Sequence, residues 1–288
     1  SEALEAYPNY FSSLYRSMVK AGEIGGVLEK SLSRGSEMLE KDEELRSKLK
    51  GALTYPAIMV LVMVLSILVL LTFVVPRFTG MFADMGTALP LPTAILINTS
   101  DFFQNWWWAM ALAVGLAITG IKQYTSSDEG RLQFDKLRLN LPFAGALVKE
   151  VSISRLSLTM GSLLESGVNI LQAMDAARDV VGNEYIGLTI DKIKREVKEG
   201  RTLSNAMSDY QSLFPSLVIG MVGTGEETGN LDEMLSNVGR YYMQESDIKI
   251  KSLTTLLEPV IILVMGVVVG FIIIAMLLPI FEMTTMVK

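Results

Sequence analysis

The stretch that decides the fold lies near the end of the chain, where residues 259–281 read PVIILVMGVVVGFIIIAMLLPIF. Two other stretches are similar: residues 56–76 read PAIMVLVMVLSILVLLTFVVP, and residues 102–121 read FFQNWWWAMALAVGLAITGI. None of the three contains a charged residue. At 1.5 Å of rise per residue, about 20 apolar residues cross the ~30 Å hydrocarbon core of a bilayer as one helix. The sequence therefore predicts three transmembrane helices, with a buried core helix as the alternative for each.

The composition supports a membrane protein and argues against several kinds of chemistry. Apolar residues make up 50% of the 288 residues, which is more than a water-soluble fold of this size needs. The chain has neither His nor Cys, and so lacks the usual general base and the commonest zinc ligands. It also has no phosphate-binding G-x-x-x-x-G-K-[ST] loop. We therefore expect no catalytic residues, no cofactor and no metal site. The net charge of −6 argues against a nucleic acid partner.

The basic residues predict how the spans are oriented. They lie before the first span, after the second and before the third, at Arg46, Lys48, Lys50, Lys122, Arg131, Lys136, Arg138, Lys249 and Lys251. The loop after the first span has Arg77 as its one base. By the positive-inside rule, residues 1–55 and 122–258 are expected in the cytoplasm. Trp106, Trp107 and Trp108 would then lie at the outer membrane interface.

An internal repeat organises the chain. Shifting the sequence by 203 residues, without a gap, aligns residues 11–80 with residues 214–283 and gives eighteen identical pairs. The second copy also includes residues 143–203, which have no counterpart before Ser1. We therefore expect the first domain to begin upstream of this sequence. Apolar periodicity predicts helices over 149–166, 168–181 and 184–199, which stop at Gly167, Gly182 and Gly200.

The expected fold is all-α: a polytopic membrane protein with two homologous cytoplasmic helical bundles, the first truncated at its N-terminus. The expected segments are the end of the first cytoplasmic domain (1–55), transmembrane helix 1 (56–76), an external loop (77–101), transmembrane helix 2 (102–122), the second cytoplasmic domain (123–258), transmembrane helix 3 (259–281) and an external tail (282–288).

Each copy of the repeat contains a G-E-x-x-G-x-L turn. Its residues are Gly22, Glu23, Gly26 and Leu28 in the first copy, and Gly225, Glu226, Gly229 and Leu231 in the second. A glycine supplies positive φ between two helices, and we expect the glutamate near the N-terminus of the next helix, where a carboxylate is favoured. Docking of a partner protein is the alternative role. The charged run at residues 40–50, EKDEELRSKLK, also has two interpretations, a solvated helix face or a docking surface.

Several residues in and beside the spans are candidates for helix packing. They are Pro56, Glu258, Pro259, Gly266, Gly270 and Pro279. Gly266 and Gly270 form a small-xxx-small pattern that lets helix backbones approach closely, within the molecule or between protomers. The same pattern also arises by chance in apolar sequence. Pro259, at the entry to the third span, is expected in a first turn or at a kink, where proline is tolerated.

These features together carry a resemblance to a known family. They are the two G-E-x-x-G-x-L turns, the Glu258-Pro259 entry to the third span, the Leu278-Pro279-Ile280-Phe281 exit, and the Glu165-Ser166-Gly167-Val168 turn. In this order, on three spans, they resemble the type II secretion system protein F family, which includes platform proteins of type IV pili. One departure is that Ile24-Gly25 in the first copy stands where the second has Glu227-Thr228.

The resemblance implies a bacterial inner-membrane platform protein with two six-helix cytoplasmic bundles. The partners it implies are a hexameric assembly ATPase, pilin or pseudopilin subunits, other inner-membrane assembly proteins, membrane lipid, and further copies of the chain in a homo-oligomer. The alternative is a transporter or permease subunit built from repeats. Permeases place charged groups and broken helices at the middle of the membrane, and these three spans carry no charge.

Overall fold

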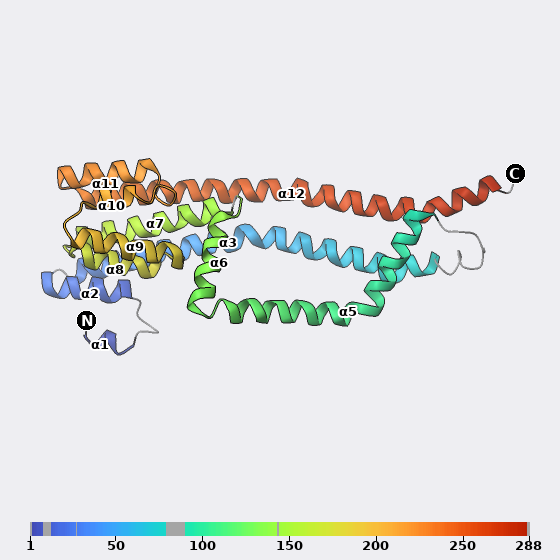
Figure 1. Ribbon diagram of the computed structural model, residues 1–288, viewed down its shortest axis with the longest axis horizontal. Coiled ribbons are helices and arrows are strands. Elements are labelled where there is room, and N and C mark those ends of the chain that lie inside the picture. Colours follow the sequence, from blue (N-terminus) through green and yellow to red (C-terminus); the bar gives the residue numbers. More distant parts are fainter. Residues whose placement is uncertain (1, 8–12, 27, 79–89, 143, 287–288) are drawn as a thin grey trace. The chain divides into compact units, whose positions relative to one another are not determined.

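The computed structural model describes residues 2–7, 13–26, 28–78, 90–142 and 144–286. Its elements, shown in Figure 1, are α1 (Glu2–Glu5), α2 (Ser13–Gly25), α3 (Leu28–Val69), the π-helical turn η1 (Leu70–Val74), α5 (Leu91–Tyr124), α6 (Asp128–Asn140), α7 (Ala144–Glu165), α8 (Ile170–Val180), α9 (Glu184–Lys198), α10 (Leu203–Ser208), α11 (Ser216–Thr228) and α12 (Leu231–Met286). No strand occurs among the described residues. The predicted all-α class is confirmed.

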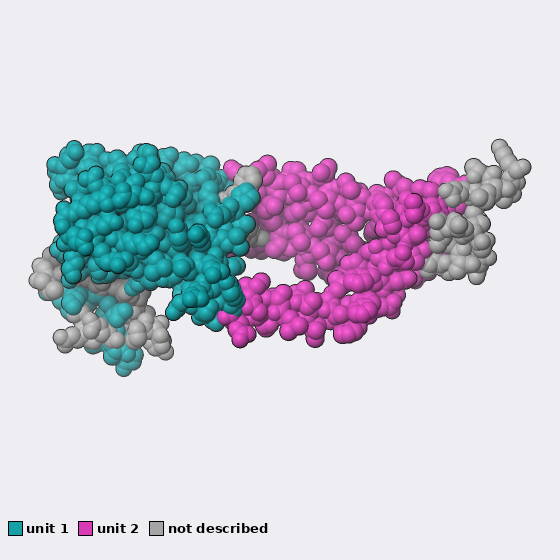
Figure 2. All heavy atoms as spheres, in the orientation of Figure 1, with its two compact units in different colours: residues 1–48, 124–250 teal, residues 49–123, 251–288 magenta. Residues whose placement is uncertain are grey.

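The chain divides into two compact units, coloured separately in Figure 2. Unit 1 comprises residues 1–48 and 124–250, and unit 2 comprises residues 49–123 and 251–288. Both α3 and α12 begin in unit 1 and continue into unit 2 without a break. The domain boundaries expected from the repeat, at residues 55 and 258, stay predictions.

Unit 1 is a helical bundle around one main core. The core is formed by α7 to α11 and the first part of α12, and its largest fully buried side chains include Phe214, Met174, Ile190, Ile193 and Leu235. A smaller cluster joins Met18 of α2 to Leu163, Val168, Ala173 and Ala176. The helix of the first repeat copy therefore packs against helices of the second copy within this unit.

The helix ends in unit 1 follow local sequence signals. Gly167, Gly182 and Gly200 adopt positive φ values of 83°, 76° and 98°, each two residues after the end of α7, α8 or α9. A left-handed residue ends a helix at little cost only when it is glycine. The three predicted stop positions are confirmed. Polar side chains begin the next helices, for example Asn169, which accepts a hydrogen bond from Leu171 N at 2.9 Å.

Helices α7 and α12 approach closely at two glycines. A Cβ atom added at Gly239 would lie 2.6 Å from Leu158 Cγ, and one added at Gly161 would lie 2.5 Å from Ser236 Oγ. The hydroxyl of Ser154 on α7 donates to the carbonyl of Gly239 on α12 at 2.8 Å. The interface is therefore close enough for a side chain of one helix to bond the backbone of the other.

The structure reproduces the internal repeat. Helix α2 begins at Ser13 and α11 at Ser216, and α3 begins at Leu28 and α12 at Leu231, so both pairs of starts are 203 residues apart (216 − 13 and 231 − 28). The linking glycines, Gly26 and Gly229, have φ values of 63° and 75°. The predicted repeat is therefore structural, because equivalent sequences form equivalent helical hairpins.

Unit 2 contains apolar helical segments that are mostly uncovered. By length and composition, two helices of the described chain could cross a membrane: Lys50–Phe78 and Leu231–Phe281. Only 11% and 17% of their most apolar windows are buried. The core helix of a water-soluble protein would be mostly buried, so the low burial favours a lipid environment for these two segments. They contain the predicted first and third spans.

The predicted second span lies in α5, which is not one of these two helices. Gln104, Asn105 and the three tryptophans lower the hydropathy of this segment. The structure also differs from the expected external loop, because residues 91–101 form the first turns of α5. Thr93, Leu96 and Ser100 share the buried face of this part of the helix. Residues 79–89 of that loop, and the end of the expected tail at 287–288, lie outside the described residues.

Candidate functional site

The repeated turn has a different geometry from the one we expected. Glu226 lies in the last turn of α11, not at the start of α12, and its carboxylate reaches back to α10. It accepts hydrogen bonds from Leu203 N at 2.5 Å, from Ser204 N at 3.0 Å and from the Ser204 hydroxyl. The carboxylate therefore does cap a helix N-terminus, but it is the N-terminus of the helix that precedes α11 in sequence.

The other residues of this turn have packing roles. A Cβ atom added at Gly225 would lie 2.9 Å from Leu231 Cα, so the glycine allows α11 and α12 to approach. Gly229 adopts the left-handed conformation that ends α11. Leu231 packs against the main core of unit 1. The second copy of the motif thus closes a helical hairpin and holds α10 against it.

The first copy has the same backbone and a more open environment. Gly22 is buried and Gly26 has positive φ, as in the second copy. Glu23 is exposed, and Leu28 is 39% exposed. The counterpart of Ser204 in the first copy is Ser1 (204 − 203), which lies outside the described residues. The structure therefore shows the capping role for Glu226.

Within each unit, a side chain of α3 contacts a carboxylate of α12. In unit 1, Lys48 Nζ pairs with Glu44 Oε1 on its own helix at 3.0 Å and with Asp247 Oδ2 on α12 at 2.9 Å. Asp247 is the repeat equivalent of Glu44 (247 − 203). The hydrogen bond from Lys48 to Asp247, and then the one to Glu44, raise the pKa of the lysine. In unit 2, the Tyr55 hydroxyl donates to Glu258 Oε1 at 3.5 Å, and these residues are also 203 apart.

The structure separates the candidate packing residues of the spans. Pro56 and Pro279 are buried, whereas Glu258 and Pro259 are exposed. Both helices continue through their prolines. A Cβ atom added at Gly266 or Gly270 would have no heavy atom within 4 Å. The structure therefore offers no close helix packing at these two glycines within the described chain, and their packing role between protomers stays a prediction.

The packing inside unit 2 centres on two hydroxyl groups that are not among the residues predicted from the sequence. The Thr93 hydroxyl donates to the carbonyl of Ala275 on α12, and the Ser100 hydroxyl donates to the carbonyl of Leu71, both at 2.5 Å. Leu71 lies in η1, where the wider turn departs from the regular α-helical hydrogen-bond pattern. Around these bonds, a small core is formed by Leu71, Val75, Leu96, Ile272 and Ala275. The spacing of Thr93, Leu96 and Ser100 at i, i+3 and i+7 was the available sequence signal.

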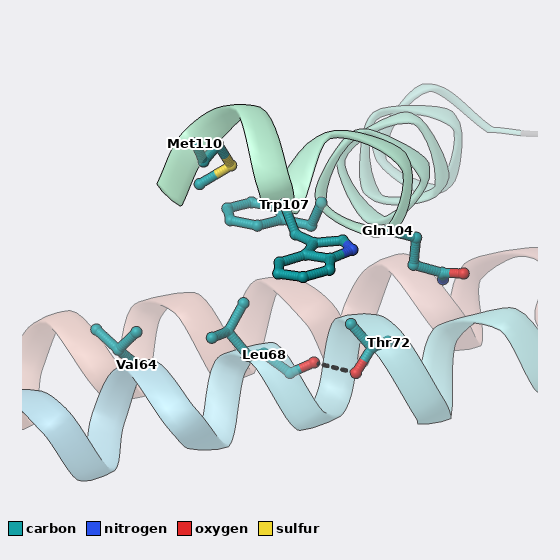
Figure 3. A pocket seen from close by; sticks show the side chains of 7 residues that line it. Val64, Leu68, Thr72, Gln104, Trp107 and Met110 are labelled. Carbon is teal, nitrogen blue, oxygen red and sulfur yellow. Dashed lines mark hydrogen bonds between the residues drawn. The ribbon is translucent and has the colours of Figure 1, made fainter. Parts of the chain in front are cut away.

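An apolar groove lies in unit 2 between α5 on one side and α3 with η1 on the other (Figure 3). It has a volume of about 560 Å³ and is lined by Val64, Leu68, Thr72, Phe103, Gln104, Trp107 and Met110. The Thr72 hydroxyl is occupied by the carbonyl of Leu68 at 2.7 Å, as Figure 3 shows. The lining has no ionisable group, so its chemistry suits an apolar surface and not acid–base catalysis. In the described part of the chain, no group of three acidic residues is placed to hold a metal ion.

Comparison with known proteins gives a family to this arrangement. The model of the family described as type II secretion system (T2SS), protein F, matches residues 1–76 and 156–279. The chain belongs to the type II secretion system protein F family. The two matched stretches end at Pro76 and Pro279, which are 203 residues apart (279 − 76). The family match therefore follows the two copies of the repeat, and it leaves residues 77–155 between them.

The relatives of this chain include proteins named for type IV pilus assembly and proteins named for type II secretion. It is 38% identical over 284 residues to a type IV pilus assembly protein PilC of Pseudomonas aeruginosa, which covers 98% of this chain and 76% of the relative. A PilC of Thermus thermophilus is 38% identical over 282 residues, with 98% and 69% covered. A type II secretion system protein F of Aeromonas hydrophila is 33% identical over 290 residues, with 100% and 74% covered.

Proposed function

We propose that this protein F family member is a multi-pass inner-membrane platform protein of a type IV pilus or a type II secretion machine. In this role it couples a cytoplasmic assembly ATPase to the movement of pilin or pseudopilin subunits into or out of the membrane. The family and the names of the relatives support the platform role. The coupling rests on one observation in the structure, the continuity of α3 and α12.

These helices connect a water-facing bundle to an apolar unit. Helix α12 has 56 residues, which corresponds to about 84 Å at 1.5 Å per residue. Its first part packs in the core of unit 1 through Leu235 and Val238, and its later part packs in unit 2 through Ile272 and Ala275. A continuous helix transmits displacement along its axis, because every turn is hydrogen-bonded to the next. A movement imposed on unit 1 would therefore reach the membrane segment.

The proposed topology places three helices across the membrane. The three spanning segments are the apolar stretches 56–76, 102–122 and 259–281, and all three belong to unit 2. Unit 1 carries basic residues that flank them, including Lys48, Arg131 and Lys249, and would lie in the cytoplasm. A motor protein would engage unit 1, and fibre subunits would engage unit 2. Other inner-membrane assembly proteins and further copies of the chain are the remaining proposed partners.

Breaking the rigidity of α12 tests the coupling. Thr255 and Leu256 are both exposed, so replacing them removes little packing. The double variant Thr255→Gly, Leu256→Gly weakens the helix by about 1 kcal/mol at each position relative to alanine. The double variant Thr255→Ala, Leu256→Ala makes nearly the same truncation and keeps the helix. We expect the glycine pair to lower fibre assembly or secretion, with the alanine pair close to wild type.

Two control measurements are needed to interpret this experiment. The amount of each variant in the membrane must be unchanged, and each must still co-purify with the ATPase and with the small pilin-like subunit. If the glycine pair assembles as many fibres as the alanine pair, transmission through α12 is not part of the function. If wild-type protein co-purifies with neither partner from membranes, the platform role itself fails.

A further inference from the structure

Helix α6 leaves an apolar stripe uncovered on the outside of unit 1. Phe134, Leu137 and Leu141 are 37%, 59% and 46% exposed. Phe134 and Leu137 are three residues apart and lie on one side of the helix. Leu141 follows them at the C-terminal cap of the helix, where the backbone becomes extended. The other side faces the bundle, where Asp135 is buried and Leu139 packs against the main core. In a water-soluble bundle, the apolar side of a helix normally faces the core. In α6 the exposed side carries apolar side chains, and the side that faces the bundle carries a buried aspartate.

The polar contacts of α6 explain why it is held in this orientation. Asp135 Oδ2 accepts from the backbone N of Glu184 at 2.7 Å, and its carbonyl accepts from Asn183 Nδ2 at 3.2 Å. These bonds place the carboxylate at the N-terminus of α9, where a negative charge is favoured. Turning α6 to bury Phe134 and Leu137 would break them. The hydrogen bonds of Asp135 therefore keep the apolar stripe exposed.

Cationic side chains flank the stripe. Arg131 precedes Phe134 by three residues and Arg138 follows it by four, so both lie beside it on the helix. Their side chains are 59% and 45% exposed, and their ion pairs with Glu184 and Asp135 are long, at 3.8 Å and 3.6 Å. The acidic residues of the first turn, Asp128 and Glu129, lie at the other end of the helix from Leu141. The open face of α6 is therefore apolar and basic in a protein whose net charge is −6.

The connection to α5 adds an aromatic residue to this face. Tyr124 ends α5, is 52% exposed, and its hydroxyl donates to Gln133 Oε1 of α6 at 2.7 Å. Tyrosine is enriched where membrane and water meet, because its ring is apolar and its hydroxyl is polar. The turn is tight, since a Cβ atom added at Gly130 would lie 2.0 Å from the Tyr124 carbonyl oxygen. The three residues between Tyr124 and Asp128 keep the start of α6 within about 14 Å of the end of α5.

We propose that α6 is an interfacial helix that binds the membrane surface. Phe134, Leu137 and Leu141 enter the boundary between lipid headgroups and acyl chains, and Arg131 and Arg138 bind anionic lipid phosphates. Helices with an apolar stripe beside Arg or Lys bind anionic membranes in this way. A lipid surface accounts for both the apolar stripe and the flanking cations, and the short link to a membrane span brings such a surface within reach. The inference rests on the proposed membrane topology of α5.

The test uses the full chain in vesicles and a single fluorescent label. The chain has no cysteine, so Leu137→Cys introduces one labelling site for an environment-sensitive fluorophore. Vesicles contain phosphatidylcholine with about one-third phosphatidylglycerol, and a spin label near the lipid headgroup acts as quencher. Leu217→Cys on α11, where the leucine is 44% exposed, is the matched control on another helix of unit 1. We expect quenching at position 137 to be at least about twofold that at position 217.

A third label separates failure of this inference from failure of the proposed function. Ile262→Cys lies in the third apolar stretch, where the isoleucine is 57% exposed, and its label should meet lipid in any membrane-spanning arrangement. Strong quenching at position 262 with equal, weak quenching at positions 137 and 217 would overturn the interfacial role of α6. Weak quenching at position 262 as well would overturn the membrane topology and the inference together.

The lipid charge tests the arginines. With the label at position 137, replacing phosphatidylglycerol by phosphatidylcholine should lower the quenching, and the variant Arg131→Gln, Arg138→Gln should lose this dependence on lipid charge. Quenching that is the same in neutral and anionic vesicles contradicts the role of the arginines. A label that stays in water in both, and is covered only when a cytoplasmic protein is added, would show that a protein and not lipid covers this face.

Discussion

Tyr55 and Glu258 occupy the same position in the two copies of the repeat, and they meet each other across α3 and α12, with the Tyr55 hydroxyl donating to Glu258 Oε1 at 3.5 Å. Lys48 contacts residues one turn back on both helices, namely Glu44 on α3 and Asp247, the repeat equivalent of Glu44, on α12. Two parallel helices whose equivalent residues face each other are in matched register. The duplication therefore produced a pair of helices as well as two similar segments.

The matched register predicts a cross-linking pattern. Cysteines introduced by Tyr55→Cys and Glu258→Cys should be joined by a short bismaleimide. The pair Tyr55→Cys and Ile262→Cys should react less, because position 262 lies one turn further along α12, about 6 Å away. The product is detected as two halves that stay joined after the chain between them is cut by a protease. Equal yields from both pairs would contradict the register.

Removing the Glu226 carboxylate should destabilise unit 1. Glu226→Ala leaves two backbone N–H groups of α10 without their acceptor, which costs about 1–3 kcal/mol in the free energy of unfolding. Glu226→Gln keeps an acceptor and should cost less. The neighbouring exposed residue provides the control, and Glu227→Ala should change stability by no more than about 0.5 kcal/mol. Denaturant unfolding measures all three. Lost assembly at unchanged stability in Glu226→Ala would instead indicate a docking role.

Two glycines of unit 1 should respond to alanine in opposite directions. Gly239→Ala places a Cβ atom 2.6 Å from Leu158 Cγ and should cost about 1–3 kcal/mol, because α7 and α12 must move apart. Gly220 lies inside α11 with nothing within 4 Å of an added Cβ atom. Gly220→Ala should therefore stabilise the unit by about 0.5–1 kcal/mol through helix propensity. Thermal unfolding gives the sign of each change, and two changes of the same sign would refute the assigned close approach.

Ser100 should matter more than its neighbour on α5. Ser100→Ala removes the bond to the Leu71 carbonyl in η1 and should destabilise unit 2 by about 0.6–2 kcal/mol in detergent. Thr99→Ala is the control, because the exposed Thr99 hydroxyl bonds only Ile95 of its own helix. Resistance to unfolding in a graded detergent series compares the two. If Thr99→Ala is as harmful as Ser100→Ala, the bond between α5 and η1 is not a stabilising contact.

Substitutions at Gly266 and Gly270 test packing between protomers. Because these glycines have open space around them within the chain, Gly266→Leu and Gly270→Leu should leave folding and insertion intact. If the surface packs against another copy, the leucines should weaken self-association and fibre assembly. Val267→Leu is the control, since Val267 is 66% exposed, whereas Val268 packs against the small core of unit 2. Cross-linking in membranes measures self-association. If the glycine variants self-associate as well as the control, these glycines have no role in packing between protomers.

The features that could be predicted from the sequence are those written in neighbouring residues. The helix class, the stops at Gly167, Gly182 and Gly200, and the equivalence of α2 with α11 all follow from local patterns. Such patterns act over one or two turns, because a helix begins, continues and ends through hydrogen bonds between residues that are close in sequence. The repeat extends this reasoning, since the same local sequence forms the same hairpin twice.

Local sequence patterns did not predict which segments that are distant in the sequence approach each other closely. The sequence pointed to Gly266 and Gly270, while the structure places the close contacts at Gly161 and Gly239. It placed Glu226 at the start of the following helix, while the carboxylate binds Ser204, which lies 22 residues earlier. It predicted a loop at residues 91–101, because Thr93 and Ser100 are polar residues. In the structure their hydroxyls donate to carbonyls of neighbouring helices, so both residues are buried in a helix.

By itself, the sequence determined that this chain is helical, duplicated, rich in apolar spans and a member of its family. These properties depend on composition, period and order along the chain. The tertiary structure alone decided which glycine meets a neighbour, which carboxylate caps which helix, and that the apolar side of α6 faces outward. Each of these depends on the few ångströms between helices, and that distance is set by how all the side chains pack together.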